Sequence, residues 1–522
     1  MEYLGEARDF YPFVLYSSHM VDEHSGRAEA ERILRLVREK KSAYWSRVRE
    51  ETALRLFRAA SLRVPAYKDF LKKHKVNPAK IKTFADFERV PETSKANYLR
   101  EYPLEKLVWD GTIKKPFVYT ATSGSTGTPF YFPLSNKLAW ESSVVHELFL
   151  RMRKEHWKEP TLVIVAFGMG VWIGGLFTYR AFAQVSDRGA NLSILTTGIN
   201  KQEILHALRR LAPHYARVIL CGYAPFLKDV IDEATAEKIN LRALNLRLLF
   251  AAEAFTEKFR DHICKKARVK NPLLDTMNIY GTADIGTMAF ETPFTILARR
   301  EMLAHPAAFN GFFGNIQKTP TLAQYNPHAI VFEAPRGDVV LTGDNAIPLV
   351  RYAIGDHGGA MSFHEAVAKM KKGGVDAMRA ARREKIVAHV SELPLVYVYE
   401  RNDFSTTLYG LQIYPEAVRD ALVEHPLNKF LTGKLTMLTK FDTKHDQYLE
   451  IHIELQKNKM IRKHIEHHTL KRIVHHLRLK ISEFRELHNY LQDRALPKLA
   501  FWPYEHKFYF KPGGKQKWVA HE

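Results

Sequence analysis

The stretch Thr122-Ser123-Gly124-Ser125-Thr126-Gly127-Thr128-Pro129 is the most informative part of this chain. It lies between two short apolar runs, Pro116–Tyr119 and Phe130–Phe132, which are typical of strands. Its two glycines allow positive φ angles and close approach of the backbone to a ligand. Its backbone N–H groups and hydroxyls offer many neutral donors to a phosphate. The residues alone fit either a phosphate-binding loop, although not one of the Walker type, or a plain hairpin turn.

The chain has 522 residues, and 78 Lys and Arg against 57 Asp and Glu give a formal net charge of +21. This length predicts roughly two to four domains. The positive charge favours polyanionic partners, such as nucleic acid, anionic lipid, a phosphorylated cofactor or an acidic carrier protein, without choosing among them. The two cysteines, Cys221 and Cys264, are too few for a disulfide framework or a cysteine zinc site.

The first residues, MEYLGEARDF, lack the basic and apolar segments of a secretory signal, so we expect a cytoplasmic protein. The apolar run Thr161–Tyr179 approaches the length of a membrane span but contains four glycines. We expect a buried strand over its first part, then a turn into a packed helix, and no transmembrane segment.

Apolar residues recur every three or four positions over residues 27–62, which predicts a helix after an N-terminal extension of residues 1–26. A second helix is expected at Asn136–Lys154, and strand-like and helix-like runs then alternate. This alternation predicts an α/β fold with a large multi-layer domain over residues 27–399. The expected strands are Thr161–Phe167, Asn191–Leu195, Arg217–Leu220 and Arg247–Ala251, and the expected helices include Lys201–Leu211 and Pro225–Ala234.

Residues 357–392 are basic and contain glycine pairs, so we expect a surface insertion with one or two helices there. Residues 400–522 combine two expected strands, Leu435–Thr439 and Tyr448–Leu455, with a long basic helix at Lys457–Phe484. This combination predicts a small C-terminal α+β domain.

The sequence TSGSTGTP resembles the phosphate-binding loop of the adenylate-forming superfamily, to which the acyl-CoA synthetases belong. The run from Phe84 to Pro103 resembles the segment before this loop in the phenylacetate–CoA ligase-like branch. The resemblance implies a large domain that binds ATP and the acid, followed by a mobile small domain. It also implies that Thr126 is catalytic and that the β- and γ-phosphates of ATP are held by Thr122, Ser123, Gly124, Ser125, Thr126, Gly127 and Thr128.

Two further segments resemble the nucleotide site of this superfamily. Glu253 follows the expected strand that ends at Ala251, and the resemblance implies that it lines the adenine pocket; a surface position or a helix cap is the alternative. The run Tyr280-Gly281-Thr282-Ala283-Asp284 resembles a Tyr-Gly-x-Thr-Glu pattern. This implies stacking of Tyr280 on adenine, nucleotide contacts from Gly281 and Thr282, and a catalytic Mg²⁺ ligand at Asp284. Asp replaces the usual Glu but is still a hard oxygen donor; a turn that starts a helix at Asp284 fits as well.

The run TGDNAIPLVRYAIGD, Thr342–Asp356, resembles the segment whose last aspartate binds both ribose hydroxyls of ATP. A carboxylate accepts hydrogen bonds from two hydroxyls at once, so Asp356 is the expected ribose ligand and Asp344 the weaker choice.

Glu400–Asp403 resembles the hinge that begins the small domain, although Glu400 replaces the usual glycine. The resemblance implies that Arg401 binds the nucleotide and that Asp403 is the pivot.

The tail Gly514–Val519 resembles the C-terminal segment whose lysine enters the active site during adenylation. This implies that Lys515 is catalytic, with Lys517 as the competing choice; a frayed basic tail is the alternative.

A histidine-rich run could present metal ligands on one helix face, but a solvated basic helix explains it better. Its members are His464, His467, His468, His475 and His476.

The resemblance implies ATP- and Mg²⁺-dependent activation of a carboxylic acid to an acyl-adenylate, followed by transfer to a thiol. An aryl, arylacetic or fatty acid fits the aromatic residues expected in the pocket wall, near Tyr223–Phe226, Phe255 and Met288–Phe290. Coenzyme A is the expected acceptor. An acidic acyl carrier protein, or an adenylyltransferase that leaves AMP on its product, is the alternative. A non-catalytic nucleic-acid-binding protein would explain the charge but not the ordered motifs, and a homodimer is left open.

Overall fold

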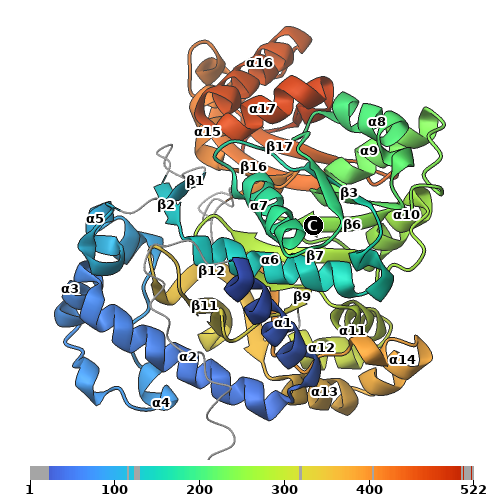
Figure 1. The fold of residues 1–522 in the computed structure, drawn as a ribbon. Coiled ribbons are helices and arrows are strands. Elements are labelled where there is room, and N and C mark those ends of the chain that lie inside the picture. The colour runs from blue at the N-terminus through green and yellow to red at the C-terminus, as the bar shows by residue number, and fades with distance from the viewer. Residues whose placement is uncertain are drawn as a thin grey trace, which may run out of the picture.

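The structure is a computed structural model that describes residues 23–114, 117–122, 130–314, 316, 320–401, 405–506, 509–510 and 519. Within these residues one mixed sheet has the strand order β10-β11-β12-β13-β9-β8-β7-β6-β5-β3-β4. Its strands are β3 (Thr161–Ala166), β4 (Leu192–Leu195), β5 (Arg217–Gly222), β6 (Arg247–Ala251), β7 (Thr276–Thr282), β8 (Gly286–Phe290), β9 (Thr321–Gln324), β10 (Ile330–Glu333), β11 (Asp338–Gly343), β12 (Leu349–Met361) and β13 (Leu395–Arg401). Figure 1 shows this sheet in the middle of the molecule, with helices around it.

Strands β4, β3, β5, β6 and β7 form the parallel half of the sheet. Every residue of β3 and β5 is buried, because parallel strands are covered by helices on both faces. The helices of this half are α6 (Asn136–Arg151), α7 (Ile173–Asp187), α8 (Lys201–Arg210), α9 (Ala224–Ala236) and α10 (Glu257–Ala267). The predicted α/β fold is confirmed.

The run Thr161–Tyr179 forms strand β3 and the start of helix α7, as its glycines predict. Among the described residues, no helix combines the length and the apolar character that a membrane crossing requires.

Strands β8 to β13 form the antiparallel half of the sheet. Helix α2 packs on β10, β11 and β12. The helices that precede the first strand are α1 (Glu23–Glu39), α2 (Ser42–Arg63), α3 (Pro65–Lys73), α4 (Phe84–Phe87) and α5 (Leu104–Leu107).

The single helix expected over residues 27–62 is in fact two helices, α1 and α2, with a break at Lys40 and Lys41. At the break, two backbone groups bind side chains instead of other backbone groups of a helix. The indole Nε1 of Trp45 donates to the Lys40 carbonyl at 3.3 Å, and the backbone N–H of Ser42 donates to Glu392 at 2.8 Å. The N-terminus of a helix has backbone N–H groups without a partner in the helix and carries a partial positive charge, so a carboxylate there is stabilising.

The region 357–392 differs in part from the expected surface insertion. Residues 357–361 belong to β12, and the two helices that follow are α13 (Phe363–Lys372) and α14 (Ala377–Arg383). Phe363, Ala366 and Met370 are buried in a small core with α11 (Pro293–Leu303) and α12 (Pro306–Phe313). Their spacing along α13 places them on one helix face, so only the opposite face is exposed.

The C-terminal part of the chain contains two small sheets. Hairpin β14–β15 joins Thr406–Leu408 to Leu411–Ile413, and the second sheet has the order β16-β17-β18. The remaining elements are α15 (Pro415–Leu422), β16 (Leu431–Phe441), β17 (Gln447–Leu455), α16 (Lys463–Lys480), α17 (Ser482–Leu491) and β18 (Lys498–Trp502). The long helix expected at Lys457–Phe484 is therefore interrupted at Ile481, whose backbone is extended and whose side chain is buried.

These C-terminal elements lie above the parallel half of the large sheet in Figure 1 and pack on it through Tyr409. The buried Tyr409 hydroxyl donates to Asp229 of α9 at 3.1 Å, and Arg494 pairs with the same carboxylate at 2.7 Å. Burial raises the pKa of Asp229 to about 6. The contact joins the two parts of the chain through one continuous hydrophobic core.

Candidate active site

Strand β7 and strand β12 bring two of the expected nucleotide-binding residues together. The Tyr280 hydroxyl on β7 donates a hydrogen bond to Oδ2 of Asp356 on β12. Asp356 is buried at 4% exposure, and in the sheet register its backbone pairs with that of Arg401 on β13. Three residues from motifs far apart in the sequence therefore meet at one place in the sheet.

A cavity of about 310 Å³ lies next to this pair, and we call it the Asp356 cavity. Glu253, Tyr280, Gly281 and Thr282 line it together with Asp356. Two buried oxygens of its lining, Asn278 Oδ1 and Thr282 Oγ1, have no hydrogen-bond partner among the described residues. Such atoms cost free energy unless a ligand or water donates to them, so the cavity fits a polar ligand.

Glu253 follows β6 and lines the Asp356 cavity, and its carboxylate also contacts the C-terminal part of the chain. It accepts hydrogen bonds from the backbone N–H of Gly410 and from Gln447 Nε2, the latter at 3.2 Å. Burial raises the pKa of Glu253 to about 7. The alternatives of an open surface position and a helix cap are both wrong.

Asp284 lies in the turn between β7 and β8, and no helix starts there, so that alternative is also wrong. Its buried carboxylate accepts a hydrogen bond from the Tyr352 hydroxyl at 2.7 Å. Lys95 Nζ is 3.4 Å from its other oxygen. Sequence reasoning did not include Lys95 among the site residues, although it lies in the Phe84–Pro103 run that resembles the ligase branch.

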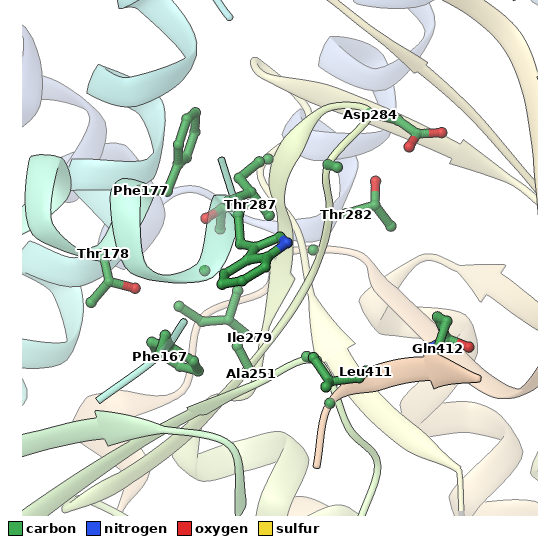
Figure 2. A pocket seen from close by; sticks show the side chains of 18 of the residues that line it. Phe167, Phe177, Thr178, Ala251, Ile279, Thr282, Asp284, Thr287, Leu411 and Gln412 are labelled. Atoms are coloured by element: carbon green, nitrogen blue, oxygen red, sulfur yellow. The ribbon is translucent and has the colours of Figure 1, made fainter. Parts of the chain in front are cut away.

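A second cavity of about 220 Å³, the Asp284 cavity, adjoins the first. Figure 2 shows Phe167, Phe177 and Thr178 on one side of it, and Thr282 and Asp284 on the other. Leu411 and Gln412 of β15 contribute from the C-terminal part. The residues that line both cavities, and so connect them, are Ala252, Ile279, Gly281, Thr282 and Gln412.

Several expected site residues lie outside the described residues: Ser123, Gly124, Ser125, Thr126, Gly127, Thr128, Asp403, Lys515 and Lys517. The strands expected on either side of the glycine-rich stretch are present as β1 (Val118–Thr122) and β2 (Phe130–Leu134). They pair antiparallel, with Thr122 opposite Phe130 at the end next to the stretch. For Thr122 and Arg401 only the backbone is described.

Other expectations need correction. Tyr223 lines the Asp284 cavity, but Phe226 and Phe255 are buried in the hydrophobic core instead. Met288 and Phe290 face a separate small cavity of about 40 Å³.

Asp344, the weaker choice for the ribose ligand, lies outside the lining of both larger cavities. Its carboxylate binds Lys137 at 2.5 Å and the Trp109 indole at 3.2 Å.

The histidine-rich run does not form a metal site in the described part of the chain, where no group of three or more potential metal ligands occurs. His476 instead hydrogen-bonds to Glu424 at 2.8 Å, between α16 and the end of α15. The expectation of solvated positions on a basic helix holds for His464, His467 and His475, which are exposed on α16, but is wrong for His476, which is buried at 8% exposure.

Comparison with known proteins agrees with this architecture, although no protein-family model matches the chain. Phenylacetate-coenzyme A ligase from Aromatoleum evansii is 23% identical over 225 residues, which cover 42% of this chain and 47% of that protein. The matched region thus spans about half the length of this curated relative.

Crystal structures of 2-hydroxyisobutyryl-CoA ligase have the same fold. The structure in the thioesterification state, in complex with 2-HIB-AMP and CoA, is 15% identical, covers 94% of this chain and 91% of its own, and has a TM-score of 0.61. The postadenylation state with 2-HIB-AMP, at the same identity and coverage, has a TM-score of 0.50. The chain therefore has the fold of the adenylate-forming superfamily, with a curated relative in the phenylacetate–CoA ligase branch that its motifs indicate.

Proposed function

We propose that this protein is an AMP-forming acid–thiol ligase. It uses ATP to convert a carboxylic acid to an acyl-adenylate and pyrophosphate, and then transfers the acyl group to a thiol, with coenzyme A as the acceptor. The observation that carries the proposal is the meeting of two cavities at Gly281 and Thr282, one beside Asp356 and one beside Asp284, whose walls include Phe167, Phe177 and Ile279.

In this proposal the Asp356 cavity takes the nucleoside. Asp356 accepts hydrogen bonds from the ribose hydroxyls, and the Tyr280 hydroxyl keeps the carboxylate in position. Tyr280 provides the aromatic face for the base, and Asn278 Oδ1 provides a buried acceptor for a base amino group. The backbone after β6, from Ala252 to Ala254, closes the cavity on the side of the C-terminal part.

The Asp284 cavity then takes the acid, with its carboxylate directed toward Lys95 and Asp284. Lys95 is a cation beside the position where the acid and the α-phosphate meet, and it stabilises the negative charge that accumulates there. The carboxylate of Asp284 fits one Mg²⁺ ligand position, since Mg²⁺ in phosphate sites needs only one or two carboxylates besides phosphate oxygens and water. When bound, the ion supplies charge neutralisation at the phosphates.

Residues Thr122–Thr128, Arg401 and Lys515 complete the proposed machinery, with Asp403 as the pivot of the small domain. Their roles rest on the sequence resemblance. Rotation of residues 400–522 about Asp403 would have to break two hydrogen bonds, from Tyr409 to Asp229 and from Gly410 to Glu253. The loss of these hydrogen bonds adds to the free-energy cost of the rotation.

The test is ATP–pyrophosphate exchange over a panel of aryl, arylacetic and fatty acids, with wild type, Asp356→Ala and Lys515→Ala. We expect acid-dependent exchange in the wild type and its loss in both variants. Addition of coenzyme A, an acyl carrier protein or hydroxylamine then identifies the product. A thioester or hydroxamate supports the ligase, whereas AMP retained on a stable product identifies an adenylyltransferase and overturns it.

A further inference from the structure

His146 is a buried residue of α6 that lines the Asp284 cavity. Its side chain is 1% exposed, and its ring packs edge-on against Phe182 of α7 at a centroid distance of 4.9 Å. Ring atom Nδ1 is 2.8 Å from the carbonyl oxygen of Ser142. A carbonyl oxygen only accepts hydrogen bonds, so Nδ1 carries the ring proton.

Burial lowers the pKa of His146 to about 4, so the ring is neutral at neutral pH. Nε2 therefore has a lone pair and no proton. This atom is buried and has no hydrogen-bond partner among the described residues. A buried acceptor without a partner costs free energy that a ligand with a donor recovers.

Apolar side chains form part of the cavity wall around His146. Phe167, Phe177 and Ile279 form walls that Figure 2 shows on several sides. The Thr287 hydroxyl is already paired with Ser142 Oγ at 2.8 Å. The cavity thus combines room for a carbon skeleton with a few polar groups: Nε2 of His146 is one buried acceptor in its lining, and Thr282, Asp284 and Glu483 contribute other oxygens.

We propose that the acid this protein activates carries a hydroxyl or N–H donor on an otherwise apolar skeleton, and that this donor binds Nε2 of His146. The inference rests on the proposed ligase function and names the substrate class of the same site. His146 is then a specificity residue: it contacts a part of the substrate away from the reacting carboxylate. A site built to accept a hydrogen bond discriminates strongly against analogues that lack the donor.

The test uses pairs of acids that differ by one hydroxyl or amino group, such as phenylacetate with its ring-hydroxylated and ring-aminated forms, and alkanoates with their 2- and 3-hydroxy forms. In pyrophosphate exchange the wild type is expected to favour the donor-bearing member of at least one pair by about 10-fold or more in kcat/KM. His146→Phe, of similar shape, is expected to abolish that preference. His146→Gln, which retains an acceptor, is expected to keep part of it.

The matched control is His328→Phe, which removes another buried imidazole outside this cavity and should leave the preference intact. His146→Leu replaces the phenylalanine variant if the latter does not fold. Equal losses for both members of a pair in the His146 variants, or a wild type that favours the unsubstituted acids throughout, would overturn this inference while the ligase function stands. Absence of exchange with every acid would overturn the function itself and this inference with it.

Discussion

The carboxylate of Glu253, at the end of strand β6, accepts a hydrogen bond from the backbone N–H of Gly410 in the turn between β14 and β15. Gln447 of β17 donates to the second carboxylate oxygen at 3.2 Å. One side chain of the large sheet thus binds two elements of the C-terminal part beside the Asp356 cavity. The two parts of the chain are therefore joined beside the cavity that we propose for the nucleotide.

This contact predicts a pH dependence of the packing between the two parts. Burial raises the pKa of Glu253 from 4.5 to about 7. When the C-terminal part moves away, the carboxyl becomes hydrated and its pKa falls back toward 4.5. Between these values the packed state binds more protons, so packing weakens as the pH rises from about 4.5 to about 7 and changes little above that.

Hydrogen–deuterium exchange of the β14–β15 hairpin between pH 5.5 and 8, corrected for the intrinsic rate, measures this dependence. Protection in the wild type should fall as the pH rises, and Glu253→Gln should flatten the change. An identical pH profile in the wild type and the variant would show that Glu253 does not control the packing.

Gly410 allows the close approach that this contact needs. It has a φ of +79°, and a Cβ atom there would lie 2.3 Å from Cδ1 of Tyr223. Gly410→Ala should therefore destabilise the protein by about 1–3 kcal/mol more than a control without the clash. Gly374→Ala is that control, since Gly374 has a φ of +92° but open space around its Cα. Denaturant unfolding checks the difference, and equal losses would contradict the prediction.

The Tyr280–Asp356 pair makes a prediction about nucleotide affinity. Removal of the hydroxyl in Tyr280→Phe deprives the carboxylate of a charge-assisted hydrogen bond, which we expect to weaken ATP binding by about 10-fold. Asp356→Asn should weaken it further, because it removes the ribose acceptor as well. Tyr67→Phe is the control, since the buried Tyr67 hydroxyl has no partner among the described residues. Calorimetric titration with ATP distinguishes these cases, and unchanged affinity in Tyr280→Phe would count against the pair.

Lys95 makes a prediction about the chemical step. Its ammonium group lies 3.4 Å from Asp284 in the cavity that we assign to the acid. Lys95→Met should lower kcat for pyrophosphate exchange by about 10-fold or more, because a cation close to the developing charge is lost. Lys95→Arg should retain part of the rate, and Lys68→Met, which changes an exposed lysine of α3, should retain all of it. A change confined to KM would assign Lys95 to binding alone.

Strands β3, β4, β5 and β6 were predictable because each is a short run of mainly apolar residues between helix-like segments, whereas β7, with the sequence TMNIYGT, was not among the expected strands. Asp356 and Tyr280 were identified by motif, and the pairing of β12 with β13 brings Asp356 beside Arg401. The break between α1 and α2 was not predictable, since it depends on a hydrogen bond from Ser42 to Glu392, which lies 350 residues away. His146 and Lys95 were missed for the same reason: each becomes informative only through neighbours distant in the sequence. An apolar helix face containing one histidine does not indicate a cavity.

The most direct test of the central claim follows an oxygen atom. An acid that supports pyrophosphate exchange, labelled with ¹⁸O in its carboxylate, is incubated with the protein, MgATP and coenzyme A. Attack of the carboxylate on the α-phosphorus, followed by acyl transfer to the thiol, leaves one labelled oxygen on the released AMP, which mass spectrometry detects. Label in inorganic phosphate together with ADP, or no nucleotide consumption with any acid of the panel, would contradict the account.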